Sequence, residues 1–254
     1  MSRETQLALS KSIYAKTRNA HDAGQLMRFL SSVDENFNTP VENEIAAIRD
    51  AGHTVACKIG CDHCCYQGVW ALPHEVLRIA SYLVDTLSGG ELVTMKRKVS
   101  GRSKLDEGTP MDFRFWSCPL LDRQRCMVYD IRPNSCAAAN SADVAPCRKA
   151  VEGARKKRES PNVPTYAPPG EVATAIRFGI VCALNDLGLY IEFVELNAGL
   201  IKVIDSPAQA WERWLSGEAV FDKAPMYKIG RFAGQADAPT LKEMAEMVAV
   251  QIRH

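Results

Sequence analysis

The segment Cys57-Lys58-Ile59-Gly60-Cys61-Asp62-His63-Cys64-Cys65 places four thiols within nine residues. A second set of four cysteines follows at Cys118, Cys126, Cys136 and Cys147, so eight of the nine cysteines lie in one part of the chain. We predict that these eight thiols converge on a buried metal centre. The helices on either side of the two sets are expected to hold that centre in place.

Composition and the first residues indicate the compartment in which these thiols work. The chain has 254 residues and a formal net charge of +1, so no bulk field favours nucleic acid or a membrane surface as a partner. The stretch Met1–Gln6 lacks the apolar region of a signal peptide, and no apolar run is long enough to span a bilayer. We therefore expect a cytoplasmic protein, whose reduced thiols serve metal binding or catalysis rather than disulfides.

The pattern of apolar residues elsewhere is typical of helices. The predicted helices are 5–36 with a turn near 19–24, 39–52, 73–87, 88–100, a charged helix after Cys147 that runs to about residue 159, 171–187, 190–204, a segment starting at Ser206, and 240–252. Short extended pieces are expected at 68–72 and 126–129, and the sequence lacks the strand–helix alternation of a parallel sheet. The predicted fold class is mostly α. A single domain of residues 1–254 is expected, with a cysteine-cluster core at 54–150 and a C-terminal helical part at 161–254.

Capping residues predict where several of these helices begin and end. Thr39 is followed three residues later by Glu42, the spacing of a capping box. Ser206 stands in the same relation to Gln209. Gly52 suits the left-handed position that ends a helix, so the cysteine segment is expected on a loop at a helix end.

The spacing of the cysteines favours soft or borderline metals. Cys61-x-x-Cys64 is a tight chelating loop for one tetrahedral ion or one edge of a cluster, and Cys57 extends it. Cys64 and Cys65 are adjacent, so their side chains are expected to diverge. Either the two thiols bind different metals, or one of them does not bind a metal and instead contacts the residues that do. The wider gaps of the second set match no zinc finger or ribbon. Because thiolates bind both zinc and iron–sulfur clusters, we favour an iron–sulfur cluster and keep zinc as the alternative.

Two other interpretations of the cysteines were weighed. Free cysteines often pack as small hydrophobes, and we expect this of Cys182, which lies in an apolar helix. The clustering of the other eight, with turn residues around them, argues against the same role for them. Cys57-x3-Cys61-x2-Cys64 also fits the three-cysteine pattern of radical S-adenosylmethionine enzymes. Those enzymes resemble partial α/β barrels, and this sequence lacks the strands they need.

Taken together, these residues resemble the YkgJ-type cysteine-cluster family of zinc- or iron-chelating domains. The matching text, within residues 54–150, is Cys57-x3-Cys61-x2-Cys64-Cys65, Pro73-His74-Glu75, Cys118-Pro119-Leu120-Leu121, Cys126-Met127-Val128-Tyr129 and Arg132-Pro133-x2-Cys136. The resemblance implies eight metal-binding cysteines. The family includes flagellin lysine N-methylases, which implies an iron–sulfur centre and S-adenosylmethionine-dependent methyl transfer. This chain is shorter than those methylases and has Ala137 where family members often carry arginine.

A few other side chains are candidates for roles near the cysteines. Arg132 is the candidate for cofactor binding, because a guanidinium can offset the charge of a thiolate-bound cluster or hold an anionic ligand. A structural salt bridge is an equally good interpretation of Arg132. His63 lies between Cys61 and Cys64 and is a candidate ligand. The interpretation that we favour is a side chain that hydrogen-bonds near the metal or is exposed to solvent. Tyr129 is expected to pack, and Trp211 and Trp214 are expected to be core or interface anchors.

Three classes of function follow from these observations. The leading hypothesis is a metal-binding protein whose iron–sulfur cluster supports S-adenosylmethionine-dependent modification of a protein or a small molecule. The second is a structural zinc site, or a site of metal storage or transfer. The third is an electron carrier or redox sensor. The sequence has no glycine-rich nucleotide loop, which counts against the first class.

Overall fold

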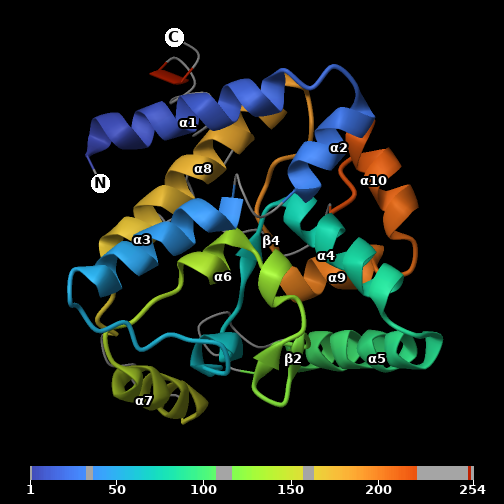
Figure 1. Ribbon diagram of the computed structural model, residues 1–254. Helices are drawn as coiled ribbons and strands as arrows, with labels where there is room; N and C mark the ends of the chain where they lie inside the picture. The colour runs from blue at the N-terminus through green and yellow to red at the C-terminus, as the bar shows by residue number, and fades with distance from the viewer. Residues whose placement is uncertain (1, 33–36, 107–115, 157–162, 222–250, 253–254) are drawn as a thin grey trace.

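The computed structural model describes residues 2–32, 37–106, 116–156, 163–221 and 251–252, and over these ranges the chain is mostly helical (Figure 1). Its α-helices are α1 (Arg3–Arg18), α2 (Ala23–Ser31), α3 (Thr39–Asp50), α4 (Pro73–Thr86), α5 (Gly89–Asp106), α6 (Asn134–Ala138), α7 (Val144–Arg155), α8 (Ala167–Asp186), α9 (Leu196–Val203) and α10 (Pro207–Leu215). The shorter elements are the 3₁₀ turns η2 (His63–Tyr66) and η4 (Tyr129–Ile131) and the strands β1 (Trp70–Ala71), β2 (Leu121–Asp122), β3 (Arg125–Cys126) and β4 (Val194–Glu195). The predicted mostly α fold class is confirmed.

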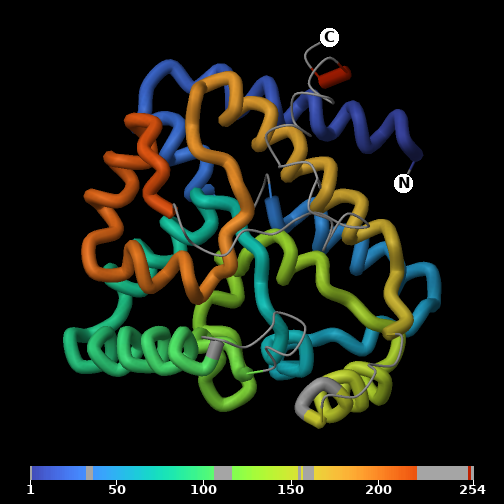
Figure 2. The backbone as a smooth tube through the Cα atoms, turned by 180° about the vertical axis from the view of Figure 1, so that it is seen from behind, coloured from blue at the N-terminus to red at the C-terminus, as the bar shows by residue number. Residues whose placement is uncertain are grey.

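Helices α1 and α8 run against each other along one side of the molecule (Figures 1 and 2). A Cβ atom at Gly179 of α8 would lie 2.5 Å from the carbonyl oxygen of Ser10 and 2.9 Å from Cβ of Ile13, both in α1. The Ser10 hydroxyl donates a hydrogen bond to the carbonyl oxygen of Ala175 at 2.9 Å. The missing side chain at Gly179 therefore permits the close approach of the two helices.

A second group of helices is arranged around α4. This helix contacts α2, α9 and α10, and α5 lies against α9. Trp214 of α10 is fully buried, and its indole N–H donates to the carbonyl oxygen of Tyr190 at 2.8 Å. Trp211 is also buried and meets Trp214 edge-on, with ring centroids 5.6 Å apart. The prediction that both tryptophans are anchors of the core is confirmed.

Several predicted helix limits are wrong. Residues 190–195 do not begin a helix, because β4 pairs antiparallel with β1 there and α9 starts only at Leu196. Helix α5 continues past residue 100 to Asp106, and its last part carries Arg102, which is 5% exposed. Helix α8 begins at Ala167, with prolines in its first turn, whereas the predicted start was residue 171.

The capping predictions are confirmed in part. Gly52 has φ +83°, and the N–H groups of Gly52 and His53 donate to the carbonyls of Arg49 and Ile48, which is a Schellman end. Asn38, not Thr39, is the N-cap of α3, and no side chain caps this end or the start of α10. The Glu42 carboxylate is instead directed at Arg132.

The remaining expectations concern short or terminal segments. Of the predicted strand 126–129, only Cys126 is in a strand, and Tyr129 begins the turn η4. The helix predicted for 240–252 lies outside the described residues, except for the helical pair 251–252. Cys182 is fully buried in α8, as predicted. Within the described ranges, no helix is both long enough and apolar enough to cross a membrane.

Candidate metal centre

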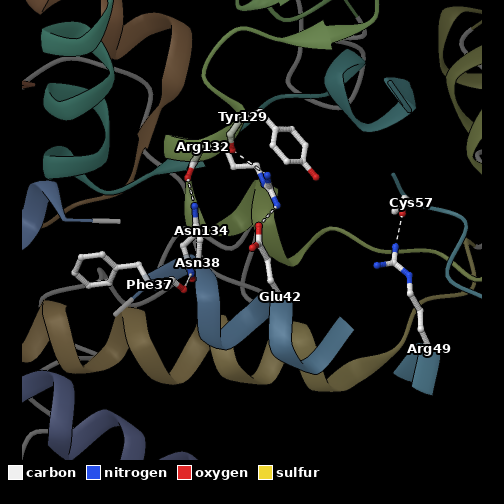
Figure 3. A network of polar contacts seen from close by, with 8 residues as sticks. All are labelled: Phe37, Asn38, Glu42, Arg49, Cys57, Tyr129, Arg132 and Asn134. Atoms are coloured by element: carbon white, nitrogen blue, oxygen red, sulfur yellow. Dashed lines mark hydrogen bonds and ion pairs between the residues drawn. The ribbon is translucent and has the colours of Figure 1, made fainter. Parts of the chain in front are cut away.

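The first cysteine segment is a loop fixed at its two ends. Helix α3 ends at Gly52, and the Arg49 guanidinium donates to the carbonyl oxygen of Cys57 at 2.7 Å (Figure 3). The N–H of Ala56 donates to the carbonyl oxygen of Ser141 at 2.8 Å, which ties this loop to the segment before α7. The chain then turns at Gly60, with φ +91°, and enters η2, which carries Cys64 and Cys65. Cys64 is exposed, and the other three thiols of this segment are half-buried.

The second set reaches the first through backbone contacts. The N–H of Cys118 donates to the carbonyl oxygen of Cys65 at 2.7 Å. Cys126 pairs with Leu121 in the β2–β3 hairpin, whose two turn residues both have positive φ, as a type I′ turn requires. Cys136 follows in α6, where its N–H donates to the carbonyl oxygen of Pro133 at 2.8 Å. These contacts bring three thiols of the second set beside η2.

Cys147 lies on the opposite side of η2 from the other three cysteines of the second set. It lies in the first turn of α7 rather than before a helix, and its thiol donates to the carbonyl oxygen of Asp143 at 3.6 Å. Helix α7 contacts η2. Figures 1 and 2 both show the segment 57–66 passing between α7 and the β2–β3 hairpin. The two cysteine sets of the sequence therefore become two flanks of η2 in the structure.

Cys64 and Cys65 interact directly. The Cys65 thiol donates a hydrogen bond to Cys64, which lowers the pKa of Cys64 to about 7 and raises the pKa of Cys65. The expectation that these two side chains diverge is therefore wrong for this structure. The reason is that η2 is a tight 3₁₀ turn, whereas neighbouring side chains point apart on an extended backbone.

Burial raises the pKa of five other thiols, those of Cys57, Cys61, Cys118, Cys126 and Cys136. Burial raises the pKa of Cys57 to about 11 and that of Cys118 to about 12, and it raises the pKa of Cys136 well above its usual range. Neighbouring thiols add to these shifts, because two thiolates repel each other. Cys57 is affected by Cys61, Cys64 and Cys147. Cys136 is affected by Cys118, Cys64 and Cys126. Cys64 is the one thiol that raises the pKa of both Cys57 and Cys136.

Two hollows lie on the two flanks of η2. The larger, of about 690 Å³, is lined by the seven cysteines other than Cys147 and Cys182. The smaller, of about 530 Å³, is lined by Cys57, Cys61, Cys64 and Cys147, together with His63. The Nδ1 atom of His63 lies 4.0 Å from the Asp62 carboxylate, so its role as ligand or hydrogen-bonding side chain stays open. All eight predicted ligands thus border one of two adjoining hollows.

The thiols are gathered but not yet arranged around a metal. Among the described residues, no three histidine, cysteine, aspartate or glutamate side chains are placed to hold one ion as they stand. The donor chemistry nevertheless fits soft metals, since a metal replaces the thiol protons that burial retains. The eight-cysteine ligand set therefore stays a prediction.

Arg132 combines the two roles considered for it. Its guanidinium forms an ion pair with the Glu42 carboxylate at 2.8 Å and lies over the Tyr129 ring, 3.8 Å from the centroid (Figure 3). Tyr129 is thus a packing partner, as predicted. The positive charge of Arg132 also lowers the pKa of Cys64 and opposes the rise in the pKa of Cys126. Arg132 is therefore a structural ion pair that also favours thiolates.

Two important residues of this region were not singled out from the sequence. Glu75 of α4 is 3% exposed, and its carboxylate accepts from the N–H groups of Leu72 and Asn134, each at 2.7 Å. Arg177 of α8 borders the larger hollow, and among the described residues no carboxylate lies at ion-pair distance from it. An arginine inside the apolar stretch 171–187 is the one sequence signal that could have identified Arg177.

The comparisons with known proteins agree with this geometry. Residues 56–160 match the family model CxxCxxCC, described as "Putative zinc- or iron-chelating domain". No match was found among the curated proteins or among the solved structures. The matched segment contains all eight clustered cysteines and both flanks of η2. Residues 56–160 of this chain are therefore similar to the CxxCxxCC family of zinc- or iron-chelating domains, which supports metal binding by the cysteine cluster.

Proposed function

We propose that the clustered cysteines hold iron–sulfur chemistry and that the adjoining hollow receives S-adenosylmethionine for the modification of a protein or a small molecule. The observation that carries this proposal is the arrangement of seven thiols around a hollow of about 690 Å³. That volume is typical of small-molecule sites. A structural zinc site is normally closed by four protein ligands and has no need of such a space.

Charged side chains around the hollow support a thiolate-bound centre. Arg102 donates to the carbonyl oxygens of Trp116 and Ser117, at 2.8 and 3.1 Å, and so holds the backbone just before Cys118. Its charge favours the thiolate of Cys118, and Arg132 does the same for Cys126. These buried cations reduce the cost of placing several negative sulfur atoms together. An iron–sulfur cluster bound there would supply one-electron chemistry.

Arg177 supports the small-molecule part of the proposal. Its Nε donates to the carbonyl oxygen of Ala173 at 3.4 Å, within its own helix, and its guanidinium lies 5.8 Å from the Phe193 ring centroid. Burial lowers the pKa of Arg177, while the negative charges of Glu75 and Cys136 oppose that shift. A guanidinium of this kind suits the carboxylate of S-adenosylmethionine, with Trp70 and Phe193 providing apolar walls.

A second candidate function rests on Cys64. Cys64 is an exposed residue and the pKa of its thiol is lowered to about 7, a combination typical of redox-active or metal-exchanging cysteines. A non-enzymatic zinc- or iron-binding protein, an electron carrier or a redox sensor would use that property. A reducing compartment such as the cytoplasm suits either function, because the thiols must stay free of disulfides.

The experiment is metal and sulfide analysis of anaerobically purified protein, followed by titration with S-adenosylmethionine. Iron with inorganic sulfide, a brown colour that dithionite bleaches, and a changed electron paramagnetic resonance signal on titration are expected. Colourless protein with a full complement of zinc would overturn the iron–sulfur proposal. Iron–sulfur protein that neither binds S-adenosylmethionine nor changes its spectrum would favour the electron carrier or redox sensor.

A further inference from the structure

The thiols around η2 differ in the hollow that they border: Cys147 borders only the smaller hollow, four others border only the larger one, and Cys57, Cys61 and Cys64 border both. One flank carries Cys57, Cys61 and Cys147. These three line the smaller hollow together with Cys64, and the remaining four clustered cysteines do not line it. The other flank carries Cys65, Cys118, Cys126 and Cys136, all of which border the larger hollow. Cys147 does not border the larger hollow. The two groups of thiols therefore do not follow the order of the sequence. Cys147 belongs to the second set in sequence, but it lies beside the cysteines of the first segment in the structure.

Separate backbone contacts hold each group. On the first flank, Ala56 donates to the carbonyl oxygen of Ser141, and the Ser141 hydroxyl donates to the carbonyl oxygen of Asp143 at 2.7 Å. These bonds hold the start of α7, and with it Cys147, against the loop of Cys57. On the second flank, the bond from Cys118 to Cys65 fixes the hairpin to η2.

The number of thiols on each flank indicates the metal centre to which Cys64 belongs. A tetrahedral zinc ion and an iron–sulfur cluster each take four thiolates when closed by cysteine alone. The first flank supplies three and is completed by Cys64, whereas the second already has four with Cys65. We infer that Cys64 and Cys65 divide the cluster into two four-thiol metal centres, Cys57/Cys61/Cys64/Cys147 and Cys65/Cys118/Cys126/Cys136. This inference deepens the proposed function and rests on its metal binding, but not on iron over zinc.

The two centres lie in different surroundings. The second has the buried Arg102 and Arg132 beside it, and Arg177 interacts with Cys136. The first includes the exposed residue Cys64 beside the half-buried His63, and none of the described residues that line its hollow is an arginine, although the Arg49 guanidinium donates to the carbonyl oxygen of Cys57. Because solvent at the exposed Cys64 gives chelators access, the first centre should exchange its metal faster than the second.

The test uses cobalt(II) alone as a probe, since tetrathiolate cobalt has its own visible absorption. Full-length metal-free protein and the variants Cys147→Ser and Cys126→Ser are refilled under anaerobic conditions and analysed for metal per chain. About two cobalt ions are expected in the wild type and about one in each variant, because each variant lacks a ligand of one tetrahedral centre. Full cobalt content in either variant, or complete loss in one that keeps its circular dichroism spectrum, would overturn the inference.

A second measurement needs no variant and covers the case in which a substitution prevents folding. Metal release from the cobalt-filled wild type to a chelator is followed in time. Two phases of about equal amplitude are expected, one for each centre. A single phase would contradict two separate centres. Iron and sulfide content decides the proposed iron–sulfur chemistry on its own, so the two hypotheses can fail independently.

Discussion

The backbone N–H of Cys118 donates a hydrogen bond to the carbonyl oxygen of Cys65 at 2.7 Å, and this bond joins the two cysteine sets. Helices α4 and α5 lie between these residues in sequence, so the bond joins segments that are far apart along the chain. The bond also leaves both thiols on one flank of η2, facing the larger hollow. The backbone contacts of the fold therefore bring the two cysteine sets together.

Ligand substitutions should separate the metal-binding cysteines from the core cysteine. Cys61→Ser and Cys136→Ser should each lose metal and become less stable, because a bound metal contributes on the order of 10 kcal/mol in small structural zinc sites. Cys182→Ser places a hydroxyl in an apolar site, which costs about 1–3 kcal/mol, and should keep the full metal content. Metal per chain and thermal midpoints check this. Loss of metal from Cys182→Ser with retention in Cys61→Ser would show that the ligand assignment is wrong.

Glu75→Ala should weaken the scaffold of the second flank. The change leaves the buried N–H groups of Leu72 and Asn134 without their acceptor, and Asn134 begins the helix that carries Cys136. A hydrogen bond to a charged group contributes about 1.5–3 kcal/mol, so urea denaturation should show a loss of at least that size. The control is Glu91→Ala, which removes an exposed carboxylate with a similar capping role at α5. Equal stability of the two variants would contradict the role given to Glu75.

Gly179→Ala should destabilise the protein. The added methyl group would lie 2.5 Å from the Ser10 carbonyl oxygen, so α1 and α8 must move apart, and overpacking of this kind costs about 1–3 kcal/mol. Gly101→Ala in α5 is the matched control, because nothing lies within 4 Å of its Cβ position. That change should stabilise by about 0.5–1 kcal/mol through helix propensity. Thermal midpoints that move in opposite directions would confirm the prediction, and a rise for Gly179→Ala would contradict it.

His74 should make the protein sensitive to acid. Its burial, with a contribution from Arg78, lowers the pKa of its imidazole well below the usual value of 6.5. As the pH falls below about 6.5, His74 is protonated in the unfolded chain but stays neutral in the folded protein. The free energy of unfolding therefore decreases as the pH drops below that value. One group contributes at most about 1.4 kcal/mol per pH unit. Denaturation of wild type and His74→Gln between pH 7 and pH 5 should show a smaller pH slope for the variant. Equal slopes would exclude His74 as the source.

Arg177→Gln should weaken binding of a carboxylate-bearing ligand. Loss of a charge-assisted pair of about 1.5–3 kcal/mol predicts roughly 10- to 100-fold weaker binding of S-adenosylhomocysteine, measured by calorimetry. Methylthioadenosine, which lacks the carboxylate, is the control ligand, and its affinity should be unchanged by the substitution. An equal loss for both ligands would show that Arg177 only shapes the hollow.

Local sequence patterns determined a large part of this protein. The apolar period and the capping residues located α1 to α4 and the end of α3 at Gly52, because a helix and its caps depend on residues a few positions apart. The clustered thiols identified the metal-chelating segment, because metal preference is a property of the donor atoms themselves.

Only the tertiary structure decided the rest. Residues 190–195 have a helical pattern but are extended, because β4 finds its partner in the distant strand β1. Cys147 is separated from the other second-set cysteines, because α7 packs on the opposite flank of η2. Arg177 reaches the hollow from α8, far in sequence from the cysteines that line it. In each case the deciding contact joins residues far apart along the chain, and the free energy of such a contact depends on which surfaces packing brings together, which a local pattern does not encode.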